Sequence, residues 1–282
     1  MSEDLTPAYG DDGEGGGGQP PVTDTGVAHS ARVLDYVLGG TDNYPADREA
    51  AERMLNGWPQ LRTSMRENRR FMHRAARYAA ERGLDQFLDI GTGIPTSPNL
   101  HEIVQAVTPS ARVVYVDNDP IVFTHAATRL AGTPEGRISY LLADMGDPDT
   151  IVQAPEVAGT LDLDRPVGLS IIAVLQFVLD AKAAYELVRG YLDRLAPGSM
   201  LTITTATSDT APVLAGSVAA EYTRRGLPVR DSTRADVEPF FEGLELVDPG
   251  VTLIHRWRPE PGTAGLVDDS EVAMYAGVAR KP

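Results

Sequence analysis

The chain has 282 residues, 42% of them hydrophobic, which is enough for one catalytic domain of roughly 200 residues plus accessory elements. Its net charge of −15 disfavours nucleic acid or an anionic membrane as a partner, because both require clustered Lys and Arg. The lack of cysteine excludes disulfides, thiolate metal sites and a cysteine nucleophile. The sequence has no secretory signal and no apolar run near the ~18 residues of a membrane helix, so we expect a cytoplasmic protein.

The first third of the chain is predicted to hold a tail and three helices. Residues 1–27 are rich in Gly and acidic residues, which predicts a disordered tail. Residues 28–84 are predicted to form an N-terminal helical cap or lid. Its helices are expected from Ser30, a capping residue, to about 38, then at 46–56 and at 61–82.

Residues 85–282 are predicted to form one α/β domain. Strands are expected at 86–90, 112–117, 137–142, 167–174 and 199–206. Helices are expected between and after them at 99–107, 120–131, 149–158, 181–195 and 210–225. This alternation is typical of a parallel, doubly wound sheet. The segments 244–247, 251–255 and 272–279 have no long helix between them and predict an antiparallel closing hairpin.

Two strands end in a pattern typical of a nucleoside site. The strand 86–90 contains Asp89 and opens into the turn Gly91-Thr92-Gly93, and the strand 112–117 ends in Asp117. In a parallel sheet, ligands bind outside the carboxyl ends of adjacent strands. There the glycine turn lets backbone approach a ligand, and a carboxylate can accept hydrogen bonds from ribose hydroxyls.

The turn departs from the dinucleotide fingerprint, whose third glycine lets a helix approach the pyrophosphate. Thr96 stands at that position, flanked by Pro95 and Pro98, so a cofactor without phosphate fits better. S-adenosylmethionine would use the turn, Asp117 for ribose, and Asp144 with Met145 for adenine. Each acid also has a plainer interpretation, as a helix cap or an ordinary loop residue.

Several segments resemble the class I S-adenosylmethionine-dependent methyltransferases, and among them the S-adenosyl methyltransferase family, first catalogued as a domain of unknown function. They are Arg32–Tyr44, Asn68-Arg69-Arg70-Phe71, Phe87–Thr96, Tyr115–Pro120, Ala173–Val178 and Leu195–Ser199. The resemblance implies a Rossmann-like seven-stranded sheet with helices on both faces and an N-terminal helical cap. It also implies S-adenosylmethionine bound over Gly91, Gly93, Asp117 and Asp144, with S-adenosylhomocysteine as product. Gln176 departs from the family, where His is frequent, which weakens any imidazole base at this position.

The candidate site follows from these motifs. The cofactor-binding candidates are Tyr36, Gly39, Arg69, Asp89, Gly91, Thr92, Gly93, Asp117, Asn118, Asp144, Met145 and Ala173. The catalytic candidates are Tyr36, Tyr44 and Gln176, although methyl transfer needs a base only if the acceptor must lose a proton. Residues 32–44 are predicted to fold over the cofactor, or else only to cover the sheet. Arg69 is predicted to reach the cofactor carboxylate, or else to form a surface ion pair.

The segment after the fourth strand bears on the methyl acceptor. Many amino-group methyltransferases carry Asn or Asp, Pro-Pro and an aromatic residue there, whereas this chain has Val174-Leu175-Gln176-Phe177. A small, partly hydrophobic acceptor is therefore expected, rather than a nucleobase or protein amide. No histidine pair has metal-ligand spacing, so no metal is expected. The alternatives are a non-catalytic cofactor sensor and a nicotinamide-dependent oxidoreductase, and the oligomeric state stays open, with a homodimer among the options.

Overall fold

The computed structural model describes residues 25–129 and 131–282, with side chains for all of these except 125–129. Residues 1–24 of the predicted tail therefore lie outside the described residues. Within the described ranges, no helix is long and apolar enough to cross a membrane.

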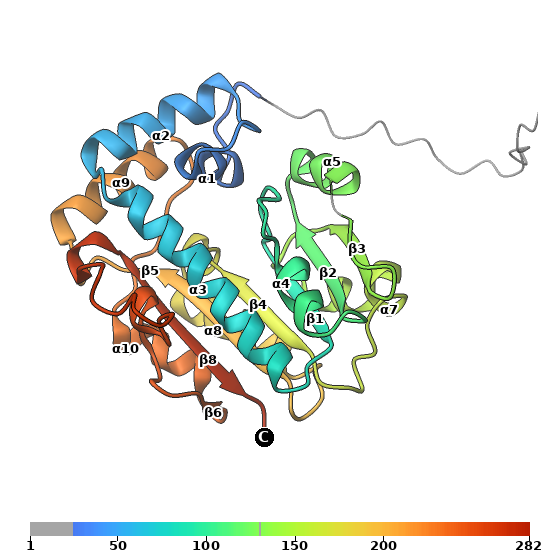
Figure 1. The fold of residues 1–282 in the computed structure, drawn as a ribbon. Coiled ribbons are helices and arrows are strands. Elements are labelled where there is room, and N and C mark those ends of the chain that lie inside the picture. Colours follow the sequence, from blue (N-terminus) through green and yellow to red (C-terminus); the bar gives the residue numbers. More distant parts are fainter. Residues whose placement is uncertain (1–24, 130) are drawn as a thin grey trace, which may run out of the picture.

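A single mixed sheet forms the centre of the molecule, with strand order β3-β2-β1-β4-β5-β8-β6 and β7 also paired with β8 (Figure 1). The strands are β1 (Gln86–Ile90), β2 (Arg112–Asp117), β3 (Arg137–Leu142), β4 (Gly168–Ile172), β5 (Met200–Ala206), β6 (Glu245–Leu246), β7 (Thr252–Leu253) and β8 (Met274–Arg280). The first five strands are parallel, and β8 pairs antiparallel with β5 along its whole length. The predicted Rossmann-like α/β class is confirmed.

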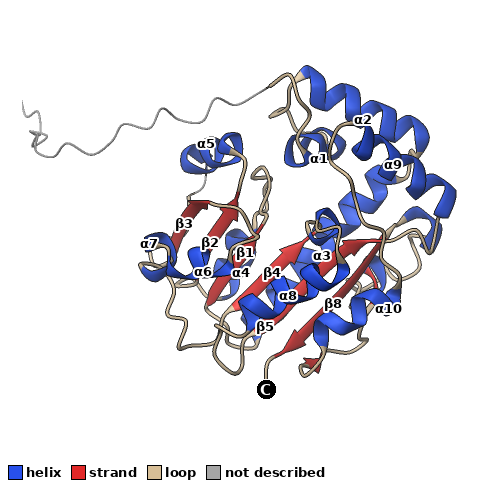
Figure 2. Cartoon of the chain, turned by 180° about the vertical axis from the view of Figure 1, so that it is seen from behind, coloured by secondary structure: helices blue, strands red, loops and turns tan. Residues whose placement is uncertain are grey.

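Helices cover both faces of the sheet (Figures 1 and 2). The helices are α1 (Ser30–Leu38), α2 (Pro45–Gly57), α3 (Leu61–Glu81), α4 (Leu100–Val107), α5 (Pro120–Arg129), α6 (Pro148–Gln153), α7 (Pro155–Ala158), α8 (Ala181–Leu192), α9 (Pro212–Arg224) and α10 (Arg234–Val237). One core packs α3 and α4 against the sheet, and a second packs α6, α7 and α8 against the other face. Both faces of the central strands are thus buried, which explains why β1 and β2 are nearly continuous apolar runs.

The predicted closing hairpin has an unusual outer strand. β6 and β7 both pair with β8, at Glu245↔Arg280 and at Leu253↔Tyr275, so they follow one another along the same edge. Pro249 lies between them and has no N–H to donate to a ladder, which interrupts the outer strand. β6 and β7 together occupy one strand position. The eight strands therefore fill the seven positions that the family resemblance implies.

The three helices before the first strand form as predicted. α1 and α2 pack on each other and, through α2, on α9, around a small core that includes Met54, Trp58 and Val218. His29, not Ser30, caps α1: its Nδ1 accepts from the N–H of Ala31 at 3.4 Å.

Several predicted elements differ from the structure. The segment 251–255 is a strand only at Thr252–Leu253 and continues as a 3₁₀ helix at Ile254–Arg256. The helix predicted at 149–158 is divided into α6 and α7 because Pro155 cannot donate the hydrogen bond that would continue α6. The strand predicted at 167–174 ends at Ile172, because Ala173 adopts φ 57°, in the left-handed region. This turn directs the chain away from the sheet at the point where the site begins.

Candidate donor site at the carboxyl ends of the strands

The turn after β1 is shaped by two glycines with left-handed backbones. Gly91 has φ 71° and Gly93 has φ 69°. A Cβ atom at Gly91 would lie 2.4 Å from Val174 Cγ1, so this position also requires the smallest residue for packing. At Gly93 the space for a Cβ atom is open, with nothing within 4 Å. That space is the cradle a ligand approaching the turn requires.

Asp117, at the end of β2, joins this turn to the neighbouring strand. One of its carboxylate oxygens accepts from the N–H of Gly93 at 2.8 Å, and the other accepts from the N–H of Asp119 at 3.0 Å. Burial raises the pKa of Asp117, against the two hydrogen bonds from the backbone. A carboxylate has about four acceptor positions, so two remain for a pair of hydroxyl groups. The predicted ribose acid and the predicted turn therefore lie in one site.

Asp89 is a second buried acid close to this turn. Its neighbours in the ladder are Tyr115 on β2 and Ser170 on β4. Burial raises the pKa of Asp89 to about 6, while a hydrogen bond from the Thr92 side chain and the charge of Arg69 oppose the rise. Asp89 is therefore placed to respond to a cation near the turn.

Arg69 contacts the loop after β1 rather than another ionic group. Its guanidinium donates to the carbonyls of Thr96 and Pro98, the second at 3.1 Å. One helical turn later, His73 Nε2 lies 3.0 Å from the same Pro98 carbonyl. Burial lowers the pKa of His73 to about 4, so the neutral ring is the form that can donate here. Helix α3 thus holds the far end of the loop through two side chains.

The loop after β3 brings together the residues predicted to contact adenine. Asn118 Nδ2 donates to Asp144 Oδ2 at 3.4 Å, and the N–H of Gly146 donates to Asp144 Oδ1 at 2.7 Å. The Met145 carbonyl accepts from the hydroxyl of Tyr191 at 2.8 Å, which anchors this loop to α8. The loop is therefore held both to the end of β2 and to a core helix.

The turn after β4 holds the acceptor-side candidates. Ala173 donates to Thr204 Oγ1 at 2.9 Å, and its carbonyl accepts from Gln176 Nε2 at 2.7 Å. Phe177 meets Tyr222 of α9 edge to face, with ring centroids 5.9 Å apart. Gln176 Nε2 thus stabilises the turn at Ala173, while its Oε1 is buried without a partner among the described residues.

The tyrosines of the cap are engaged with other parts of the cap. The Tyr36 hydroxyl donates to Glu52 at 2.9 Å, and this hydrogen bond is the main cause that raises the Tyr36 pKa. The N–H of Tyr44 donates to Asp47, and the Arg32 guanidinium lies 5.6 Å from the centre of the Tyr44 ring. Gly39, with φ 91°, ends α1 beside open space. Within the described ranges, the hydrogen bonds and ring contact of Tyr36 and Tyr44 stay inside the cap, so the predicted roles of these two residues and of Gly39 stay predictions.

Three side chains lie around the site although the sequence did not indicate them as site residues. His29 and Arg32 of the cap approach Asp119, and His73 holds Pro98. Asp119 precedes Pro120, which signals a helix start and nothing more. Within the described ranges, no group of three or more His, Asp or Glu residues could hold a metal ion.

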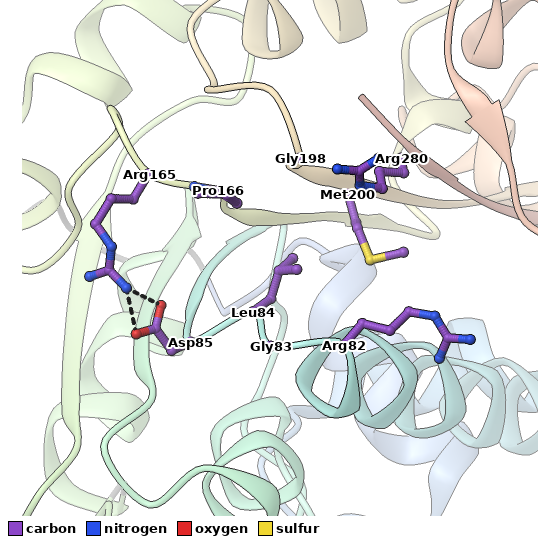
Figure 3. A pocket seen from close by; sticks show the side chains of 9 residues that line it. All are labelled: Arg82, Gly83, Leu84, Asp85, Arg165, Pro166, Gly198, Met200 and Arg280. Carbon is purple, nitrogen blue, oxygen red and sulfur yellow. Dashed lines mark hydrogen bonds and ion pairs between the residues drawn. The ribbon is translucent and has the colours of Figure 1, made fainter. Parts of the chain in front are cut away.

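A hollow of about 370 Å³ lies away from these residues, at the amino ends of the parallel strands, and is lined mostly by residues that precede β1, β4 and β5 (Figure 3). Its arginines already have partners: Arg165 binds Asp85, Arg280 pairs with Glu245, and Arg82 lies over the Tyr78 ring. Because ligands of such sheets bind at the opposite edge, this hollow is not the candidate site.

Comparisons with known proteins give the family of the chain. The S-adenosyl methyltransferase family model matches residues 17–282. The crystal structure of a DUF574 family protein from Streptomyces avermitilis MA-4680 has 55% identity and a TM-score of 0.89, covering 92% of this chain and 99% of that one. A crystal structure from Thermobifida fusca YX has 37% identity and a TM-score of 0.83, covering 93% and 98%. No curated protein matches the chain.

Strand order, glycine turn and family match together define a class I methyltransferase, an enzyme that uses S-adenosylmethionine. More narrowly, the chain belongs to the S-adenosyl methyltransferase family.

Proposed function

We propose that this methyltransferase binds S-adenosylmethionine over the Gly91–Gly93 turn and methylates a small, partly apolar molecule beside Gln176 and Phe177. The observation that carries the donor site is the pair of hydrogen bonds on Asp117, from Gly93 and Asp119, which leaves two acceptor positions for the ribose. Asp144 and Met145, held by Asn118 and Tyr191, would line the adenine pocket.

The donor supplies a methyl group on a positively charged sulfur. In the transfer, a lone pair of the acceptor forms a bond to the methyl carbon while the carbon–sulfur bond breaks and its electron pair stays on sulfur. The residues of this chain have to align acceptor and donor. Asp89, buried near the turn, would favour the cationic donor over the neutral product when it is ionised.

The residues beside the expected acceptor are suited to orient the acceptor rather than to remove its proton. Gln176 is an amide, so it can accept a hydrogen bond from an N–H or O–H group of the acceptor but cannot take up its proton. Tyr36 is kept protonated by its hydrogen bond to Glu52, which makes it a poor base. We therefore propose that the acceptor is a small amine or alcohol whose proton leaves to water.

The lining and the charge support a small acceptor. Val174 and Phe177 are partly buried apolar side chains beside the turn, and Phe177 packs on Tyr222. The net charge of −15 opposes a polyanionic acceptor such as nucleic acid.

The test measures formation of S-adenosylhomocysteine from S-adenosylmethionine in fractionated pools of small metabolites and in macromolecular fractions, with and without the enzyme. Growth of product with one fraction supports the proposal and identifies the acceptor class. Product growth only with macromolecular fractions would contradict it. Donor binding without turnover in any pool would favour the sensor alternative, and stabilisation by NAD rather than by the donor in a thermal-shift assay would favour the oxidoreductase alternative.

A further inference from the structure

Asp119 connects the N-terminal cap to the donor site. It lies two residues after Asp117, immediately before α5, and is only 3% exposed. Its Oδ2 atom is 3.3 Å from Arg32 Nε and 3.1 Å from His29 Nδ1, and both of these residues belong to the start of α1. A buried acid of the α/β domain is thus paired with the cap.

The other polar groups of Asp119 face the site and the next helix. Its N–H donates to Asp117 Oδ1 at 3.0 Å, and its Oδ1 accepts from the N–H of Ile121 at 2.9 Å. The side chain therefore caps α5 with one oxygen and faces the cap with the other, while its backbone holds the predicted ribose acid. Any movement of Asp119 changes the hydrogen bond that orients Asp117.

Arg32 makes this arrangement rigid. Its side chain is buried as well, at 4% exposed, with Nη2 donating to the Val27 carbonyl at 3.2 Å and Nη1 lying 3.6 Å from Asp47. A buried carboxylate that loses its cation is strongly destabilised, since neither water nor another charge compensates it. The position of α1 and the position of Asp119 are consequently linked.

We propose that Asp119 is a positioning residue of the donor site and that Arg32 is its anchor: their ion pair across the cap interface holds the Asp119 N–H on Asp117 and so presets that carboxylate for the two ribose hydroxyls. This inference rests on the proposed binding of ribose by Asp117. Because coupling between sites is reciprocal, ribose binding in turn stabilises the docked cap.

The experiment compares two ligands, S-adenosylhomocysteine and an analogue of it that lacks both ribose hydroxyls, by titration calorimetry. Asp119→Asn keeps an oxygen for the Ile121 N–H and removes the charge that faces Arg32. We expect this variant to bind S-adenosylhomocysteine about tenfold more weakly, within the usual range of coupling between sites, and to bind the analogue like the unchanged protein. Arg32→Gln removes the same pair from the cap side and should show the same hydroxyl-dependent loss, so the test survives if one variant does not fold.

The double variant extends the comparison. If Asp119 and Arg32 act as one unit, combining the two substitutions should weaken binding no further than either alone. Asp47→Asn is the matched control, because Asp47 is a buried partner of Arg32 that has no contact with Asp117. It should lower the melting temperature and weaken both ligands by the same factor, since it affects the cap and not the ribose acid.

Asp117→Asn separates the two levels of the proposal. If this variant discriminates between the ligands as well as the unchanged protein does, ribose is bound elsewhere and the donor site itself is wrong. If Asp117→Asn loses the discrimination but Asp119→Asn and Arg32→Gln retain it, the donor site holds and the positioning role is overturned. An equal loss for both ligands in Asp119→Asn also overturns it, because the residue would then be structural only.

Discussion

The N–H of Gly93 donates to the carboxylate of Asp117 at 2.8 Å, and this bond joins the turn after β1 to the end of β2. The glycine is needed for its backbone and the acid for its remaining acceptor positions, so neither residue defines the site without the other. Substitutions on the two sides of this contact should therefore affect stability and donor binding differently.

Gly91→Ala and Gly93→Ala are a matched pair of substitutions that should separate an effect on stability from an effect on donor binding. Both add a side chain at a left-handed backbone, which costs roughly 1–2 kcal/mol, but only at Gly91 does the new atom also collide with Val174. We expect Gly91→Ala to lower the free energy of unfolding by more than Gly93→Ala. Gly93→Ala should stay folded and lose donor affinity, because its methyl group occupies the open cradle. Chemical denaturation and calorimetry measure the two effects, and normal donor affinity in Gly93→Ala would place the ligand elsewhere.

Asp89 should make stability and binding depend on pH. Its pKa is raised from 3.8 to about 6 in the folded chain, so between these values the folded state holds more protons than the unfolded state. By linkage, stability is greatest below about pH 4 for this group and is lost as the pH rises through 6. Asp89→Asn should therefore stabilise the ligand-free protein by about 1–3 kcal/mol at pH 7.5 and have little effect at pH 4.

Binding should show the opposite trend at Asp89. An ionised carboxylate favours the sulfonium donor, so the affinity for S-adenosylmethionine should rise between pH 5 and pH 7, and Asp89→Asn should remove much of that rise. Binding of the neutral-sulfur product provides the internal control. Identical pH profiles for donor and product would contradict an electrostatic role for Asp89 toward the sulfur.

Arg69 and Arg70 are adjacent on α3 and provide a matched comparison. Arg69 donates to two carbonyls of the loop after β1, whereas Arg70 is exposed and its ion-pair partner among the described residues is Glu67. Arg69→Met should free the loop and weaken donor binding about tenfold, since hydrogen bonds from charged donors contribute roughly 1.5–3 kcal/mol. Arg70→Met removes the partner of the buried Glu67 and should lower stability, but it should leave the donor dissociation constant within about twofold, because among the described residues Arg70 has no hydrogen bond to the loop after β1. Equal effects in calorimetry would show that the loop contacts of Arg69 are unimportant.

Tyr191 should control the loop that is predicted to contact adenine. Its hydroxyl donates to the Met145 carbonyl from the buried face of α8. Tyr191→Phe should cost about 1 kcal/mol of stability and weaken binding of S-adenosylhomocysteine several-fold, because the loop at 144–146 loses its anchor. Tyr185, on the same helix, has no hydrogen bond to this loop, so Tyr185→Phe is the control and should bind normally. A Tyr191→Phe variant with unchanged affinity would separate this loop from the adenine pocket.

The sequence predicted the sheet better than the contacts between its parts. β1, β2 and β3 have the expected bounds, because each is a short apolar run between polar turns. β1 and β2 are buried on both faces, as the alternation with helices predicts, whereas β3 lies at the edge of the sheet and is only partly buried. The division of the helix at Pro155 had a local signal, since proline cannot continue a helix. The left-handed turn at Ala173 had none, because alanine rarely adopts it.

The residues of the site could be predicted only where they belong to a local sequence motif. Gly91, Gly93 and Asp117 stand in recognisable positions after two strands, and the structure brings them together. The partners of Arg69 and Arg32 could not be predicted, because they lie about 30 and about 90 residues away and are chosen by how α3 and α1 pack on the sheet. The same holds for Gln176, whose hydrogen bond to Ala173 depends on a backbone angle that composition does not reveal.

The position of β8 has a consequence for how the molecule is made. β8 is the last strand along the chain, yet it lies inside the sheet, between β5 and the short outer strands. While a ribosome is still synthesising residues 274–280, β5 therefore presents an unpaired edge along seven residues, the kind of template that favours aggregation. A nascent chain of this enzyme needs protection from neighbouring polypeptides until its final strand has emerged.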